Sequence, residues 1–118
     1  MLKRISPILS PELIHLLAQM GHGDEIVIAD ANFPAASVAQ RLVRAEGHPI
    51  PALLDAVLQF FPLDSYVNAP VVLMDVVPGD PPEPDIWETY AEIIACHERA
   101  ISTEHIERFA FYERARKA

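Results

Sequence analysis

Short apolar runs set between helical patterns are the feature that most restricts the fold of this chain. Residues 26–28 (Ile-Val-Ile) and 71–74 (Val-Val-Leu-Met) are continuously apolar, which is typical of strands buried on both faces of a sheet. Apolar residues recur at helical spacing over residues 11–21, 51–61 and 85–100. Because strands and helices alternate, we predict an α/β fold in which both faces of the sheet are covered.

Local signals predict where several elements begin and end. Ser10 is expected to cap a helix whose first residue is Pro11, and Gly21 is expected to end it. Residues 25–30 and 42–43 are predicted as strands, and residues 31–37 and 78–82 as loops. A short element at residues 105–107 leads to a helical segment at 109–117. The chain has 118 residues and no internal repeat or linker, so residues 1–118 are predicted to form one domain.

Composition limits the possible partners and compartment. The chain is 51% hydrophobic and 22% charged, enough for a folded core. A net charge of −8 argues against nucleic acid or an anionic membrane as partner. The single cysteine, Cys96, is expected to pack on a helix, and it gives no sign of an oxidising compartment. No apolar run approaches the roughly 20 residues of a membrane span, and Pro7 interrupts any N-terminal signal pattern, so we expect a cytoplasmic protein.

His22 is the strongest candidate for chemistry. It stands between Gly21 and Gly23, after a helical pattern and before an apolar run. The glycines permit a sharp turn and leave the imidazole open, and histidine transfers protons near neutral pH. The alternative is a helix-capping histidine without a chemical role.

Asp30 and Arg108 are the next candidates. Asp30 closes the predicted strand at residues 25–30, and ligands of α/β proteins gather at the carboxyl ends of strands; Asp30 could equally cap the following loop. Arg108 precedes a Phe-Ala-Phe-Tyr run, so it could hold sugar hydroxyls beside an aromatic face or make a surface ion pair. Five histidines without metal-ligand spacing, no nucleophile motif and only four glycines argue against metal, nucleophilic or dinucleotide chemistry.

Several motifs resemble the L-fucose mutarotase and D-ribose pyranase family. The resemblance extends over the whole chain. Its motifs are Leu2-Lys3-x-Ile5-Ser6-Pro7, Ser10-Pro11-Glu12-Leu13, Met20-Gly21-His22-Gly23-Asp24-Glu25-Ile26, Asp30-Ala31-x-Phe33-Pro34-Ala35, Leu63-Asp64-Ser65-Tyr66 and Arg108-Phe109-Ala110-Phe111-Tyr112-Glu113-Arg114-Ala115-x-Lys117-Ala118. The last of these motifs is similar to the fucose branch rather than the ribose branch.

This resemblance implies an α/β fold with a small central sheet flanked by helices. It also implies an enzyme, an isomerase that interconverts the α and β anomers of a free sugar without metal or organic cofactor. It implies that His22 is the catalytic histidine, that Asp30 and Arg108 bind substrate, and that His105 is a weaker sugar-binding candidate. The implied substrate is L-fucose, with D-ribose as the alternative and a non-catalytic sugar-binding module as a third possibility. The implied assembly is a ring-like homo-oligomer, often a decamer, although smaller assemblies occur in the family.

The resemblance also implies a C-terminal segment that residues 1–118 do not include. Family members continue with an apolar strand, a Thr-Gly-Glu turn and a sugar-contacting Tyr-x-Asn segment. We expect the 118-residue sequence to be an incomplete record, because the similarity is close up to Ala118; the alternative is a shortened protein with reduced or changed activity.

Overall fold

The computed structural model describes residues 1–81 and 84–118, in which five helices and two strands are found. In chain order they are α1 (Pro11–Gln19), α2 (Ala35–Val38), α3 (Ile50–Leu58), β1 (Val71–Met74), α4 (Asp85–His97), β2 (Thr103–Ile106) and α5 (Arg108–Ala115). Of the predicted loop at residues 78–82, Pro82 lies outside the described residues. Within the described ranges, no helix has both the length and the apolar character needed to span a bilayer.

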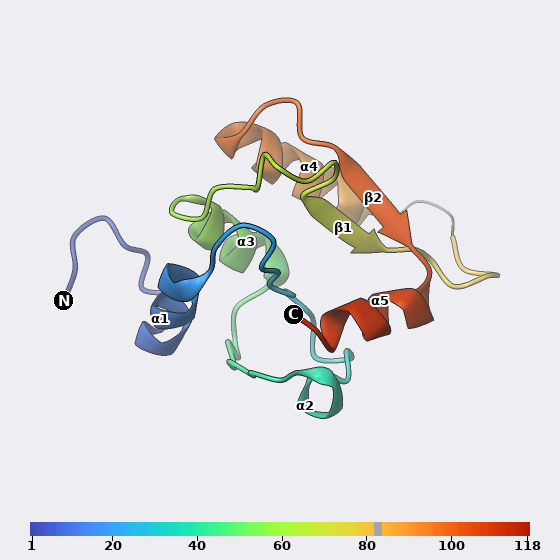
Figure 1. The fold of residues 1–118 in the computed structure, drawn as a ribbon, viewed down its shortest axis with the longest axis horizontal. Helices are drawn as coiled ribbons and strands as arrows, with labels where there is room; N and C mark the ends of the chain where they lie inside the picture. The colour runs from blue at the N-terminus through green and yellow to red at the C-terminus, as the bar shows by residue number, and fades with distance from the viewer. Residues whose placement is uncertain (82–83) are drawn as a thin grey trace.

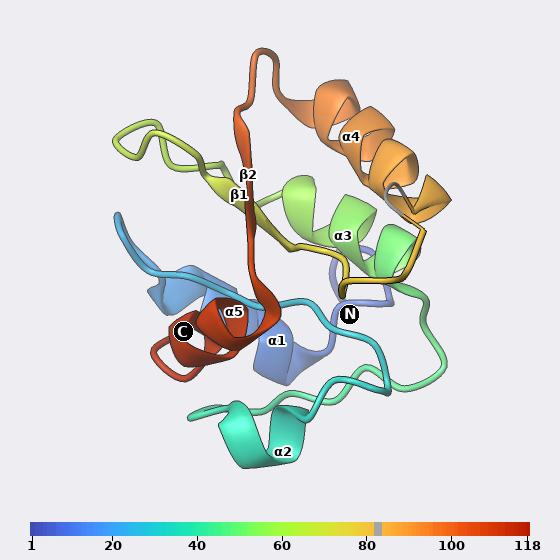
Figure 2. The same cartoon turned by 90° about the vertical axis from the view of Figure 1, so that its right-hand side faces the viewer.

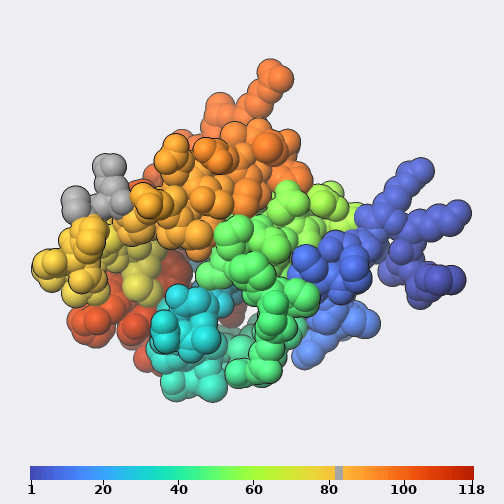
Figure 3. Space-filling model, turned by 180° about the vertical axis from the view of Figure 1, so that it is seen from behind, coloured from blue at the N-terminus to red at the C-terminus, as the bar shows by residue number. Residues whose placement is uncertain are grey.

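The two strands form a parallel sheet, and α4 makes the crossover between them. Val71 pairs with Thr103 and Met74 with Ile106, and the amide of Asp75 extends the ladder by donating to the carbonyl of Ile106 (2.7 Å). Figure 2 shows α3 and α4 together beside this strand pair, and Figure 3 shows the same two helices side by side on the rear surface. Helix α5 packs against β1, so the predicted small sheet flanked by helices is confirmed.

The core lies between α1 and α3 (Figure 1). The Ser10 hydroxyl accepts a hydrogen bond from the Leu13 amide (3.1 Å), and Pro11 begins the helix, as predicted. This cap directs Leu13 into a cluster with Leu9 and Val57, where Val57 is only 2% exposed. Helix α1 is therefore packed against α3, and residues 20–24 follow its C-terminal end.

The prediction of a strand at residues 25–30 is wrong. The segment contributes Ile26 and Ile28 to the core, but in the described part of the chain it pairs with no strand. Residues 42–43 likewise form no strand. An apolar run reports burial, whereas a strand also requires a neighbouring backbone with which to bond.

Three other expectations are corrected. The strand β2 begins at Thr103 rather than at residue 105, and most of its residues are exposed, so its polar sequence lacks the signal of a buried strand. The predicted loop at residues 31–37 contains the short helix α2. Cys96 lies on α4, as expected, but its side chain is exposed rather than packed.

Candidate functional site

His22 lies on the turn that follows α1, and its side chain is 73% exposed. Asp24 stabilises this turn, because its Oδ2 accepts a hydrogen bond from the Gly21 amide (2.8 Å). Gly23 has a φ of 84°, in the left-handed region that glycine adopts without steric cost. The sequence prediction of a sharp turn presenting an open imidazole is therefore confirmed.

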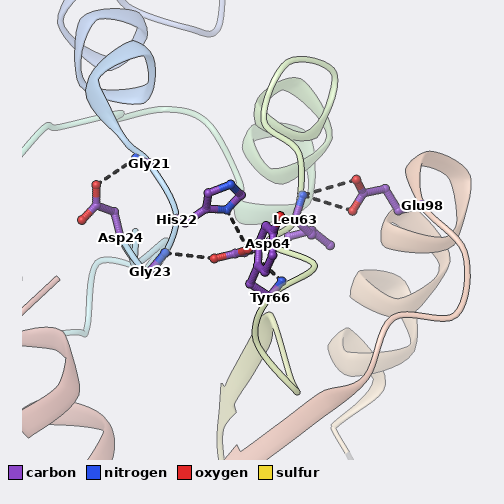
Figure 4. A network of polar contacts seen from close by, with 8 residues as sticks. All are labelled: Gly21, His22, Gly23, Asp24, Leu63, Asp64, Tyr66 and Glu98. Carbon is purple, nitrogen blue, oxygen red and sulfur yellow. Dashed lines mark hydrogen bonds and ion pairs between the residues drawn. The ribbon is translucent and has the colours of Figure 1, made fainter.

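The structure brings Asp64 to His22. Oδ1 of Asp64 lies 3.0 Å from His22 Nδ1 and accepts the Tyr66 amide at 2.9 Å, while Oδ2 accepts the Gly23 amide at 2.9 Å (Figure 4). The side chain of Asp64 is 19% exposed. Sequence reasoning missed this carboxylate, which is 42 positions away from His22; the Leu63-Asp64-Ser65-Tyr66 motif was the available signal.

The hydrogen bonds to Asp64 determine the tautomer of His22. Bonds from the Tyr66 and Gly23 amides, with a smaller contribution from His22, lower the pKa of Asp64 below its ordinary value of 3.8, against the opposing effect of burial. Asp64 is therefore ionised at neutral pH and can only accept hydrogen bonds. Nδ1 of His22 must then carry the hydrogen, which leaves Nε2 for a ligand.

A large cavity opens beside this pair. Its volume is about 900 Å³, and its walls are mostly apolar, with contributions from α1, α3, β1 and residues 25–28. His22, Asp64 and Tyr90 line it, and the Tyr66 ring contacts the His22 ring edge-on, with 4.5 Å between centroids. Of the four site residues predicted from the sequence, His22 alone is among the described residues that line this cavity.

The Asp30 side chain caps the loop that follows it. Its Oδ1 accepts hydrogen bonds from the amides of Asn32 (2.9 Å) and Phe33 (3.1 Å), which is the structural role that the sequence left open. Burial, followed by the charge of Asp30, raises the pKa of Tyr90 above its ordinary value. Asp30 is thus electrostatically linked to a residue that lines the cavity.

Arg108 begins α5 and stacks on an aromatic ring. Its guanidinium carbon lies 4.6 Å from the centroid of the Phe109 ring. Phe33, from the loop of Asp30, contacts Phe111 and Tyr112 edge-on at 6.0 and 5.4 Å. The segments that contain Asp30 and Arg108 therefore pack together through aromatic rings.

His105 lies apart from these groups, on β2. Its ring contacts Trp87 with centroids 4.5 Å apart, and a hollow of about 270 Å³ adjoins the two rings and the first turn of α4. Across residues 1–81 and 84–118, no three His, Cys, Asp or Glu side chains are grouped so that they could hold a metal ion.

Comparison with known proteins identifies the family of this chain. The model of the RbsD / FucU transport protein family matches residues 3–118. The chain belongs to the RbsD/FucU family. Among its relatives, the L-fucose mutarotase of Actinobacillus pleuropneumoniae serotype 5b is 46% identical over 119 residues, covering 100% of this chain and 83% of that protein. The fucose mutarotase of Mus musculus is 49% identical over 123 residues, covering 99% and 80%.

Solved RbsD/FucU structures share the fold as well. The crystal structure of the fucose mutarotase in complex with L-fucose from Streptococcus pneumoniae has a TM-score of 0.94 and 48% identity, covering 99% of this chain and 84% of that chain. FucU from Bifidobacterium longum has a TM-score of 0.91 and 47% identity, covering 97% and 82%. The family predicted from the sequence motifs is therefore confirmed.

Proposed function

We propose that this chain is an L-fucose mutarotase, an isomerase that interconverts the α and β anomers of free L-fucose. The observation that supports this most directly is the likeness, at 48% identity and a TM-score of 0.94, to a fucose mutarotase that binds L-fucose. The His22–Asp64 pair supplies an acid–base group suited to this reaction.

The reaction needs proton transfer and nothing more. Ring opening protonates the ring oxygen, removes the proton of the anomeric hydroxyl and releases an open-chain aldehyde, which rotates and recloses. His22 acts in its imidazolium form, in which Nδ1 keeps its hydrogen bond to Asp64 and Nε2 carries a second proton. The Nε2 proton passes to the ring oxygen on opening, which leaves the neutral Nδ1–H tautomer, and returns to Nε2 on closure, while water accepts the anomeric proton on opening and gives one back on closure. Asp64 stabilises the imidazolium and holds its orientation through Nδ1. General acid–base catalysis of this kind typically contributes about 10²–10⁴-fold.

The remaining sugar contacts follow from the family resemblance. Asp30, Arg108 and, more weakly, His105 are proposed to bind the sugar, with no metal or cofactor involved. Within the described residues Oδ2 of Asp30 makes no hydrogen bond, because both loop amides bond Oδ1, so Oδ2 can accept from a sugar hydroxyl.

The wider setting is proposed on the same grounds. Residues 1–118 form one sugar mutarotase domain that assembles as a homo-oligomer, as a decameric ring, in the cytoplasm. Large exposed apolar side chains support association; among them are Phe60, Tyr66 and Phe109. The single unpaired cysteine is consistent with a reducing compartment.

Exchange NMR on two sugars tests the substrate. Magnetisation transfer between α and β resonances should be accelerated for L-fucose more than for D-ribose at equal enzyme concentration. A larger acceleration for D-ribose would replace the proposal with ribose pyranase activity. Binding of L-fucose in a calorimeter without any acceleration would indicate a sugar-binding module instead.

A further inference from the structure

We propose that Glu98 is a positioning residue for His22, acting through Leu63 and Asp64. Glu98 follows α4, and its carboxylate accepts the Leu63 amide, with Oε2 at 3.1 Å and Oε1 at 3.3 Å. Leu63 immediately precedes the carboxylate that holds the imidazole (Figure 4). The inference rests on the proposed function, in which His22 transfers the proton.

The turn that carries His22 and the turn that carries Asp64 are stabilised mainly by hydrogen bonds between them. Asp64 bonds the Gly23 amide and His22 on one turn and the Tyr66 amide on its own turn. Helix α3 fixes the chain only as far as residue 61, through the carbonyl of Val57. Among the hydrogen bonds of residues 62–66 in the described ranges, those to Glu98 are the ones made from the end of a helix.

Glu98 is itself firmly placed. Its amide closes α4 by donating to the carbonyl of Ile94 (2.9 Å), so the side chain departs from the end of a 13-residue helix. Next to it, His97 Nε2 lies 2.7 Å from Asp55 Oδ1, which ties the end of α4 to α3. The half-buried Glu98 carboxylate therefore holds residues 63 and 64 in place relative to two packed helices, α3 and α4.

The location of Glu98 is unfavourable for the helix alone. The C-terminal end of a helix has partial negative charge and favours cations, so an anion there is mildly destabilising. A charge-assisted hydrogen bond to the Leu63 amide compensates for this, because such bonds are about twice as strong as neutral ones. The presence of an acid at position 98 is thus explained by its hydrogen bonds to the Leu63 amide rather than by the stability of α4.

The test compares Glu98→Ala with Glu98→Gln and with Glu92→Ala, which removes an exposed acid from the same helix. Anomer exchange of L-fucose gives kcat and KM, and ¹⁵N NMR of the His22 ring gives its tautomer. We expect Glu98→Ala to lower kcat about tenfold with little change in KM, the order of effect of one charged hydrogen bond. The Nδ1–H tautomer should lose its dominance in the same variant.

The conservative variant should restore both readouts. Glu98→Gln keeps an oxygen that accepts the Leu63 amide, so kcat and the tautomer should return most of the way to wild type, and Glu92→Ala should match wild type. If Glu98→Ala does not fold, Glu98→Asp replaces it; its carboxylate is one methylene shorter, and the same losses should appear in reduced form.

A purely structural role gives a different result. If Glu98→Ala, or Glu98→Asp in its place, lowers the unfolding temperature but keeps the wild-type kcat and tautomer, the inference is overturned. The tautomer is measured without substrate, so it is independent of the proposed activity. Wild-type protein that fails to accelerate anomer exchange would refute the mutarotase proposal, while the ring ¹⁵N shifts of the variants would still decide the role of Glu98.

Discussion

Replacing Asp64 by Asn tests whether the carboxylate sets the tautomer of His22. The carboxylate accepts three hydrogen bonds through two oxygens, from Tyr66 and His22 at Oδ1 and from Gly23 at Oδ2. An Asn side chain has one accepting oxygen and one donating amide group. If its oxygen faces His22, its amide group opposes the Gly23 amide; if it is turned round, its amide group faces Nδ1 and favours the Nε2–H tautomer.

Both orientations of the Asn side chain impair proton transfer. We expect Asp64→Asn to reduce the rate of L-fucose anomer exchange by about 10²-fold or more, the lower part of the range for acid–base catalysis. Saturation-transfer NMR at fixed enzyme concentration measures the loss. Asp24→Asn is the matched control; Asp24 bonds the Gly21 amide rather than the imidazole, so its loss should be much smaller. Wild-type exchange in Asp64→Asn would refute the role given to this carboxylate.

Three further predictions concern pH and stability. The pKa of Asp64 is lowered in the folded state. Ionised Asp64 therefore stabilises the fold at pH values above its ordinary pKa of 3.8, and this stabilisation is lost as the pH falls through the folded-state pKa. The difference in unfolding free energy between wild type and Asp64→Asn, measured in urea, should shrink on acidification, and a constant difference would contradict this. Asp30→Asn should lower the raised pKa of Tyr90 only in part, because burial is the larger cause; titration of tyrosinate absorbance checks it, and an unchanged pKa would exclude the link. Ser10→Ala removes the cap on the Leu13 amide and should cost ~1 kcal/mol, seen by calorimetry as a Tm lower by about 3–6 °C, whereas an unchanged Tm would show that the cap is dispensable.

Local signals in the sequence predicted the helices well. Ser10 and Pro11 define the start of α1 through a hydrogen bond and a fixed φ angle that involve only neighbouring residues. The run at residues 71–74 is both apolar and paired. The run at residues 25–30 is equally apolar but unpaired, because pairing depends on a distant backbone that a local pattern does not describe.

The sequence predicted the turn of His22 but not the carboxylate that faces it, for the same reason. The glycines beside His22 are adjacent in sequence, so the open turn follows from local chemistry. Asp64 is distant in sequence, and its contact with His22 exists only once α1 and α3 have packed. Glu98 is farther still from His22 and acts through a backbone amide, for which no side-chain motif is required.

The central claim is that His22 transfers the proton in fucose mutarotation. The most direct measurement is one-dimensional exchange NMR on L-fucose with wild type, His22→Ala and His48→Ala, since His48 is an exposed histidine on another loop. Wild type and His48→Ala should accelerate anomer exchange equally, while folded His22→Ala should leave it at the uncatalysed rate. Exchange at the wild-type rate in His22→Ala would contradict the account.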